Sequence, residues 1–190
     1  PPRSTLFPYT TLFRSVNREL ARRWDYPLHL GVTHAGTRET GAIRSAAALG
    51  ALLSEGIGDT IRISYSGDPT FEVAHGLELL YSLRLRARRG IELIACPTCG
   101  RLQTDIAPLV EQVRAALADV IEPVTVAVMG CVVNGPGEAQ GADVAICAGK
   151  GKAMLYRRGE MVRTVGADEI VPAIVEEVHR LIGRGGGIVD

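Results

Sequence analysis

The chain has 190 residues, of which 46% are hydrophobic and 22 are glycine, so it can bury a core and hold one or two domains. Its 21 basic and 21 acidic residues balance, which excludes an overall positive field that would recruit nucleic acid or an anionic membrane. No apolar run approaches the roughly 20 residues that span a bilayer, no signal peptide opens the chain, and four cysteines are too few for a disulfide scaffold. The sequence therefore predicts a soluble, cytoplasmic protein with reduced thiols.

Residues 1 to 15 form a segment of their own. The sequence PPRSTLFPYTTLFRS contains the near-repeat STLFPY and TTLF, and its pattern does not match the rest of the chain. Short peptide sequences of this kind resemble translated sequencing-adapter DNA. We therefore expect a non-native leader here, outside the predicted fold.

Residues 16 to 90 read as strand, helix, strand, helix. Strands are expected at 28–33 and 60–66. The first helix, from Glu39 to Glu55 with a left-handed stop at Gly56, has an expected buried stripe of Ile43, Ala46, Ala47, Gly50 and Leu53. Asp68 is the expected N-cap of the second helix, which ends near Gly90 and buries Phe71, Ala74, Leu77 and Leu80. Two such units in series imply parallel strands and right-handed crossovers.

Residues 91 to 190 read as a small α+β domain with a flexible tail. Strands are expected at 91–95, 124–129 and 143–147, followed by a hairpin about Arg158 and Gly159. Asp105 is the expected cap of a helix that buries Ile106, Leu109, Val110, Val113 and Leu117. A closing helix at 167–182 buries Ile170, Ala173, Ile174, Val178 and Leu181.

Two cysteine loops leave neighbouring strands of this domain. Cys96 and Cys99 follow the strand at 91–95, and Cys131 follows the strand at 124–129. Adjacent parallel strands would bring these thiols to one edge of the sheet. The pair alone fits a metal site, a redox pair or structural thiols, and the third cysteine favours a metal. Cys147 lies inside a strand and is predicted to be an ordinary buried thiol.

The loop after Cys131, GCVVNGPGEA, predicts close packing around a bound group. Its glycines and proline leave no room for side chains near whatever the loop wraps. Glu138 follows and could supply a fourth ligand, although a glutamate in such a loop is more often simply solvated.

Four stretches, ACPTCGR, GCVVNGPGEA, YPLHLGVTHAG and LLSEGIGDTIRIS, together resemble the 4-hydroxy-3-methylbut-2-enyl diphosphate synthase family. The resemblance covers about residues 16 to 182. It implies the last two βα units of a TIM-type barrel, followed by an α+β iron-sulfur domain of the sulfite/nitrite reductase type. It also implies a [4Fe-4S] cluster held by Cys96, Cys99, Cys131 and Glu138.

The resemblance further implies an oxidoreductase of non-mevalonate isoprenoid biosynthesis. The substrate would be 2-C-methyl-D-erythritol 2,4-cyclodiphosphate, opened reductively with loss of water, and the electrons would come from ferredoxin or flavodoxin. Glu138 would act in proton transfer, and Arg62, Ser64 and Asn134 match substrate-binding positions. From the residues alone, Arg62 is as readily a solvated or paired strand residue.

Two departures from the family stand out. His34 occupies a position where the family commonly has an active-site glutamate, so it is a candidate catalytic residue, although a lone histidine at a strand end is often structural. The second departure is length, because a complete barrel takes roughly 250 residues. We therefore expect a C-terminal fragment that is inactive alone, from a protein that is a homodimer at full length.

Two other functions are compatible with these residues. Cys96, Cys99 and Cys131 could hold a structural zinc ion with a histidine or carboxylate. Alternatively the domain could be a stand-alone electron carrier. Glu138 argues against this function, because a pure carrier benefits from four thiolate ligands.

Overall fold

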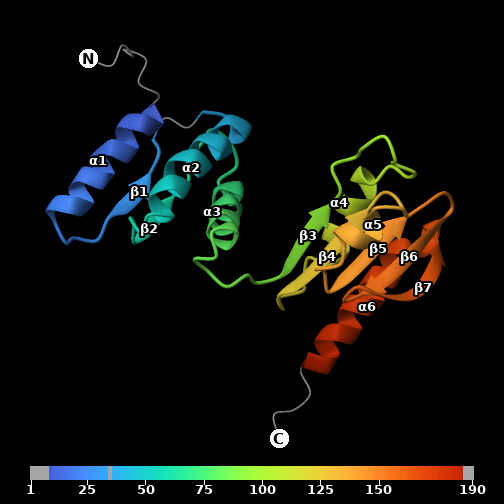
Figure 1. Ribbon diagram of the computed structural model, residues 1–190. Coiled ribbons are helices and arrows are strands. Elements are labelled where there is room, and N and C mark those ends of the chain that lie inside the picture. Colours follow the sequence, from blue (N-terminus) through green and yellow to red (C-terminus); the bar gives the residue numbers. More distant parts are fainter. Residues whose placement is uncertain (1–8, 34–35, 186–190) are drawn as a thin grey trace, which may run out of the picture. The chain divides into compact units, whose positions relative to one another are not determined.

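The computed structural model describes residues 9–33 and 36–185 (Figure 1). The candidate catalytic residue His34 lies outside these ranges, as do residues 1–8 of the expected leader. The chain divides into two compact units, Pro1–Ala87 and Arg88–Asp190, and each is described by itself. Within the described ranges, no helix combines the length and the apolar character that crossing a bilayer requires.

The first unit contains two βα units preceded by a helix. Its elements are α1 (Tyr9–Arg23), β1 (His29–Gly31), α2 (Arg38–Leu53), β2 (Thr60–Arg62) and α3 (Thr70–Ser82). The two strands pair in parallel, with Leu30 opposite Ile61. The predicted strand-helix order and parallel pairing are confirmed. Residues 9–15, which were expected to lie outside the fold, form the first half of α1, where Phe13 packs against the core of this unit.

The core of the first unit corrects the predicted stripe of α2. Leu49 and Leu52 are buried, whereas Ile43 is 71% exposed. The larger apolar area of Ala48, Leu49, Leu52 and Leu53 decides which face of the helix turns inward, and Ala46 and Ala47 remain outside. Gly41 lies on the buried face, where a β carbon would come within 2.7 Å of the Cβ of Tyr65, so this close packing requires glycine.

The ends of the helices partly follow the prediction. The backbone N–H of Thr70 donates to Oδ1 of Asp68 over 2.9 Å, so Asp68 caps α3 as expected. Gly56, after α2, has φ of +75° and is the predicted left-handed stop. The predicted end of α3 near Gly90 is wrong. Arg84 adopts φ of +56°, and the N–H of Leu85 donates to the carbonyl of Leu80, which closes α3 at Ser82.

The second unit is a five-stranded mixed sheet with helices on both faces. Its elements are β3 (Ile91–Ala95), α4 (Ala107–Ala116), β4 (Val124–Met129), α5 (Gly135–Glu138), β5 (Val144–Ala148), β6 (Lys152–Arg157), β7 (Glu160–Gly166), the 3-10 turn η1 (Ala167–Glu169) and α6 (Ile170–Gly185). The strands lie in sequence order; β3, β4 and β5 are parallel and the last two pairings are antiparallel. The predicted hairpin is confirmed, with positive φ at both Arg158 and Gly159.

The two faces of this sheet carry different cores. Alternate residues of β4, β5 and β6, such as Val126, Ile146 and Leu155, pack with the buried stripes of α4 and α6. The other face carries Met129 and Cys147, and it packs with Ala139, which directly follows α5. The short helix α5 was not predicted from the sequence, because four residues leave no periodic pattern. It fixes the loop that follows Cys131 against the sheet.

Candidate metal centre

The two cysteine loops meet at the carboxyl edge of the parallel strands. Ala95, the last residue of β3, pairs with Val128, and the N–H of Cys96 continues the ladder by donating to the carbonyl of Val128 over 3.2 Å. The N–H of Gly130 donates to Sγ of Cys96 over 3.4 Å. The predicted convergence of the two loops at one sheet edge is therefore confirmed.

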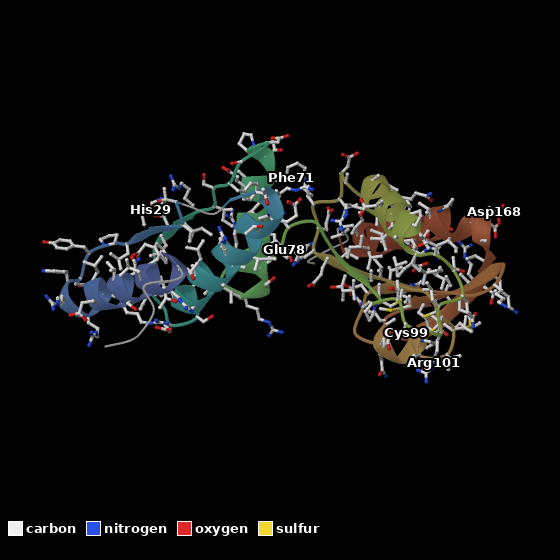
Figure 2. All side chains as sticks on the ribbon, turned by 90° about the horizontal axis from the view of Figure 1, so that it is seen from above. His29, Phe71, Glu78, Cys99, Arg101 and Asp168 are labelled. Carbon is white, nitrogen blue, oxygen red and sulfur yellow. The ribbon has the colours of Figure 1, made fainter. Side chains whose placement is uncertain are left out.

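The four predicted ligands line one cavity of about 190 Å³. Its wall contains Cys96, Cys99, Cys131 and Glu138, together with Asn134, Pro97, Arg101, Leu102, Met129 and Gly130. Cys131 is buried, Cys96 is half-buried, and Cys99 and Glu138 are exposed. Figure 2 shows Cys99 and Arg101 near one another on this unit. Sulfur and carboxylate donors thus share a small chamber that opens to solvent.

Backbone amides surround the sulfur of Cys131. N–H groups of Asn134, Gly135 and Val133 donate toward it and hold the pKa of this thiol below its ordinary value, against the opposing effect of burial. Hydrogen bonds of this kind stabilise a thiolate, which is the form that binds metal. The loop GCVVNGPGEA therefore favours the thiolate form of Cys131.

The three thiols and the carboxylate of the cavity are of the kinds that can bind a cluster containing several iron ions. Among the described residues, no three His, Cys, Asp or Glu side chains are placed to share a single metal ion. Ligands of a polynuclear cluster bind different irons, so they stand around the wall of a chamber instead of converging on one point. Thiols on two loops, amide donors at Cys96 and Cys131, and the apolar side chains of Leu102 and Met129 supply such a wall.

Only one of the two glycines after Asn134 is required by close packing. A β carbon on Gly135 would lie 2.8 Å from Sγ of Cys147, whereas one on Gly137 would meet nothing within 4 Å. Packing within the chain thus leaves no room for a side chain at Gly135 and leaves room at Gly137, while the closeness of this loop to a bound group stays a prediction. The sequence alone cannot distinguish them, because both stand beside the same proline.

Cys147 lies behind the cavity and is not on its wall. The side chain is fully buried in β5, and burial raises the pKa of its thiol to about 12. The neighbouring Cys131 and Glu138 contribute smaller parts of this rise. A thiol held neutral in this way is a packing residue, as the sequence predicted.

The predicted substrate residues are divided between the units. Asn134 is exposed on the cavity wall beside Cys131. Arg62 ends β2, and its side chain crosses Gly31, whose β carbon would lie 3.2 Å from the Nε of Arg62. Ile63 is buried while Arg62 is exposed and Ser64 half-buried, so the predicted alternation of this strand holds.

Arg101, which was not predicted from the sequence, brings a cation to the cavity. It stands two residues after Cys99 in the same motif, and that proximity was the available signal. Arg101 lies within a turn that follows Cys99, and this turn places it on the cavity wall. The N–H of Leu102 closes the turn by donating to the carbonyl of Cys99 over 3.0 Å.

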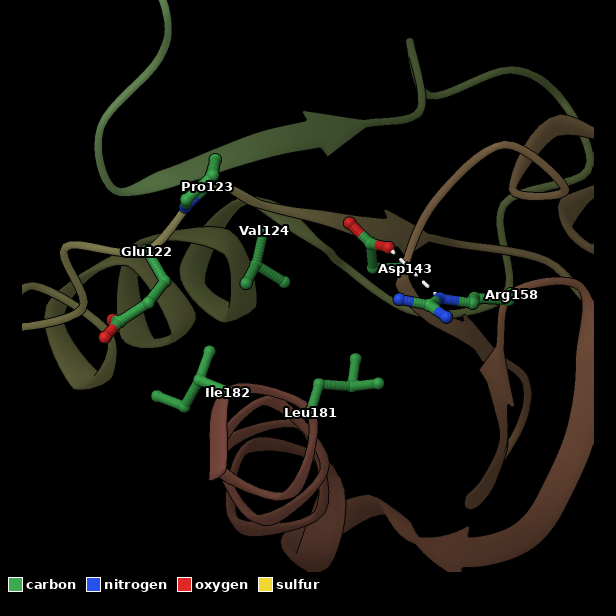
Figure 3. A pocket seen from close by; sticks show the side chains of 7 residues that line it. All are labelled: Glu122, Pro123, Val124, Asp143, Arg158, Leu181 and Ile182. Carbon is green, nitrogen blue, oxygen red and sulfur yellow. Dashed lines mark ion pairs between the residues drawn. The ribbon is translucent and has the colours of Figure 1, made fainter. Parts of the chain in front are cut away.

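A second cavity of about 290 Å³ lies at the opposite edge of the sheet (Figure 3). It is bordered by the start of β4 at Val124, the hairpin turn at Arg158, and Leu181 and Ile182 of α6. Of its three charged side chains, Arg158 and Asp143 form an ion pair, with Nε of Arg158 3.5 Å from Oδ1 of Asp143, and Glu122 is the third. This cavity contains none of the cysteines, so the cysteine cavity remains the candidate metal centre.

Two family models match this chain. The model of the GcpE TIM-barrel domain matches residues 9–77, and that of the GcpE protein C-terminal domain matches residues 92–180. The first match begins inside the expected leader, whose foreign origin stays a prediction.

Curated relatives carry the name 4-hydroxy-3-methylbut-2-en-1-yl diphosphate synthase (flavodoxin). The chain is 53% identical over 164 residues to the one from Corynebacterium diphtheriae, a match that covers 86% of this chain and 42% of the relative. It is 52% identical over 167 residues to the one from Geobacter sulfurreducens, covering 88% of this chain and 47% of the relative. The chain therefore spans less than half the length of these relatives.

Both family models match in their expected order, and the C-terminal match contains the cysteine cavity and the whole five-stranded sheet apart from its first residue. Taken with an identity near one half along most of the chain, these matches show that the chain belongs to the GcpE family.

Proposed function

We propose that this chain carries the cluster-binding part of a 4-hydroxy-3-methylbut-2-en-1-yl diphosphate synthase. The observation that carries the proposal is the shared cavity of Cys96, Cys99, Cys131 and Glu138 at the carboxyl edge of β3 and β4. The reaction is the two-electron reductive opening of 2-C-methyl-D-erythritol 2,4-cyclodiphosphate with loss of water. The names of the relatives support flavodoxin as the electron donor.

The cysteines are proposed to hold a [4Fe-4S] cluster, with Glu138 as the fourth ligand. When bound, the cluster supplies the electrons of the ring opening. The amides of its own loop lower the pKa of the Cys131 thiol and so favour its thiolate, and Cys96 accepts a hydrogen bond from the N–H of Gly130. Cys99 is the most exposed of the three and stands at the mouth of the cavity.

Glu138 is proposed to move the proton that leaves with water. A carboxylate is a weaker ligand for iron-sulfur clusters than a thiolate, so Glu138 would be the most easily exchanged of the four ligands. Its position on the cavity wall, exposed to solvent, lets it exchange protons with bulk water between turnovers. Asn134, on the same wall, offers an amide that can donate to a substrate oxygen.

The diphosphate is proposed to bind cations and hydroxyls of the first unit. Arg62 is exposed and forms no hydrogen bond or ion pair with any described residue, and Ser64 lies two residues after it, beyond the end of β2. His34 is proposed to replace the active-site glutamate that the family commonly has at this position of the sequence. Homodimer formation is proposed for the full-length protein.

The test is a hybrid enzyme. The 167 matched residues of the Geobacter sulfurreducens relative are exchanged for those of this chain, and ring opening is measured with reduced flavodoxin after anaerobic cluster assembly. We expect a brown protein with turnover within about tenfold of the parent, because the ligand cavity is preserved. A colourless protein that binds zinc, or a cluster that cycles without consuming the cyclodiphosphate, would overturn the proposal.

A further inference from the structure

The basic residues of this chain are unevenly divided between lysine and arginine. Of the 21 basic residues, all are arginines except Lys150 and Lys152. Both lysines lie in or beside the turn between β5 and β6, residues 149–152, which we call the lysine turn. Lysine differs from arginine in carrying a compact, strongly hydrated charge on a flexible stem. The chain thus concentrates this type of charge at a single place.

The lysine turn packs against both cysteine loops. The hydroxyl of Thr104 donates to the carbonyl of Gly149 over 2.9 Å. A β carbon on Gly149 would lie 3.1 Å from Cγ1 of Val132 and equally close to Oε1 of Gln103. Since β5 runs parallel to β4, its carboxyl end reaches the same edge of the sheet as Cys131. The turn therefore borders the candidate cluster site.

Lys152 also lies on the same face of the sheet as that site. It begins β6, where side chains alternate between the faces, so it shares a face with Met154. Met154 pairs directly opposite Cys147, which belongs to the face that carries Met129 and packs with Cys96. Ala153, between them, is buried in the core on the opposite face. The ammonium of Lys152 thus stands on the side of the cysteine loops.

The charges of the lysine turn are exposed and uncompensated. Both lysines are exposed, and among the described residues neither forms an ion pair. They do not line the cavity, whose wall holds the one further cation Arg101 and the carboxylate of Glu138. Val132, whose Cγ1 faces Gly149, is followed in the Cys131 loop by Val133, which leaves 68% of its surface in solvent. The lysine turn is therefore an exposed, positively charged segment that packs against the Cys131 loop.

We propose that the lysine turn is the docking surface for a small acidic electron-transfer protein. The proposal rests on the proposed function, because docking at this edge matters only if the cavity holds a redox cluster. Electron-transfer encounters use small interfaces, and complementary charge at their borders speeds association. The lysine turn supplies that charge next to the cysteines that would carry the electron.

A small anion such as diphosphate fits this surface less well than a protein does. Ligand sites for small molecules are concave and converge several polar groups on one point, whereas Lys150 and Lys152 stand on an exposed turn outside the cavity. A macromolecular partner can instead meet separate charges across a surface. The acidic protein is therefore the occupant to which the observations point.

The first test uses the scarcity of lysine. A carbodiimide joins amines to carboxylates, so crosslinking the chain to a purified bacterial flavodoxin of net negative charge, whose own amines have been acetylated, can involve only Lys150, Lys152 or the amino terminus of this chain. We expect a crosslinked species that mass spectrometry maps to the lysine turn, and that disappears in Lys150→Gln/Lys152→Gln and at high salt. This test needs neither cluster nor turnover, so it stands apart from the proposed function.

The second test measures reduction of the assembled cluster by stopped flow. Lys150→Glu/Lys152→Glu should slow reduction by flavodoxin about tenfold at low ionic strength and leave reduction by methyl viologen unchanged. The control Arg114→Gln/Arg163→Gln removes two exposed cations elsewhere, Arg114 on α4 and Arg163 on β7, and should leave both rates near those of the parent.

Three results would overturn the proposal. Equal slowing with both reductants would place the effect on the cluster itself, and a crosslink that maps only to the chain terminus would exclude the lysine turn. Protection of the lysines by millimolar inorganic pyrophosphate but not by flavodoxin would assign the turn to a small anion.

Discussion

Gly135 packs directly against Cys147, so that a β carbon on the glycine would lie 2.8 Å from the sulfur and 3.2 Å from the Cβ of Cys147. The contact joins α5 to the interior of β5 and so fixes the loop that carries Cys131. The loop geometry of the proposed cluster site therefore depends on a residue that is not itself a ligand.

Gly135→Ala should disturb this loop while Gly137→Ala should not. The added methyl at residue 135 meets Met129 and Cys147 in β4 and β5, which cannot move aside, and should cost about 1–3 kcal/mol of stability. At residue 137 the same methyl meets open space. Thermal unfolding and iron content after reconstitution check the pair; equal loss in both variants would contradict the packing described.

Cys147 should resist alkylation while the cavity thiols react. Its side chain is fully buried and the pKa of its thiol is about 12, so at pH 8 almost none is present as thiolate. In the cluster-free protein, iodoacetamide should label Cys99, which is exposed, well before Cys147. Peptide mass spectrometry over time measures both rates. Comparable labelling of Cys147 in the folded protein would show that β5 opens readily.

The sequence predicted the second unit better than the first. In α4 and α6 long apolar stripes leave one possible inner face, and both stripes were found as expected. In α2 small residues occur on several faces of the helix, so the sequence pattern does not show which face is buried. The face that contains Ile43 was wrongly predicted to be the buried one. Packing against β1 and Tyr65 determines which face of α2 is buried, and the spacing of apolar residues along the helix carries no information about these contacts.

Some features of the candidate site could likewise be predicted from the sequence, and others could not. Strand order and the positions of Cys96 and Cys131 follow from apolar runs and could be predicted. The closeness of the lysine turn could not, because it depends on the antiparallel return of β6 beside β5 and on the bond from Thr104 to Gly149. Contacts between loops that no pattern links are visible only in the structure.

Glu177→Gln should destabilise the second unit by about 2–3 kcal/mol, because it removes one partner of a buried ion pair. The carboxylate of Glu177 is 3% exposed and bonds to the side chains of Arg157 and Arg180. The neighbouring Glu176 pairs with Arg163 and Arg180 in solvent, so Glu176→Gln should cost below about 1 kcal/mol. Hydrogen exchange of β5 and β6 peptides in rising urea compares the two. Equal effects would show that burial does not distinguish these pairs.

The same carboxylate should make stability depend on acid. The hydrogen bond from Arg157 is the main cause that lowers the pKa of Glu177 from 4.5, against burial, which raises it. Because the folded state holds the proton less tightly than the unfolded state, this contribution is complete above pH 4.5 and is lost as the pH falls through the folded pKa. Unfolding of Glu177→Gln should depend less steeply on pH between about 5 and 3 than unfolding of the parent; parallel curves would contradict this assignment.

Trypsin should cut first between the two units. Arg84, Arg86 and Arg89 are exposed in the segment from α3 to β3. We expect early cleavage there and a resistant fragment beginning near residue 90, because the five-stranded sheet has its own core. Mass spectrometry and circular dichroism of the isolated fragment check this. Loss of secondary structure in the fragment would show that the sheet needs the first unit.

Iron and acid-labile sulfide content after anaerobic reconstitution shows which side chains of the cavity hold the cluster. Cys96→Ser, Cys99→Ser and Cys131→Ser should each lose most of the cluster, because thiolates supply most of the binding energy, whereas Glu138→Ala should retain it. In the hybrid enzyme, Glu138→Ala should keep the cluster yet lose most of its turnover. A cysteine variant with unchanged iron and sulfide, or a Glu138→Ala enzyme with full activity, would contradict the ligand set.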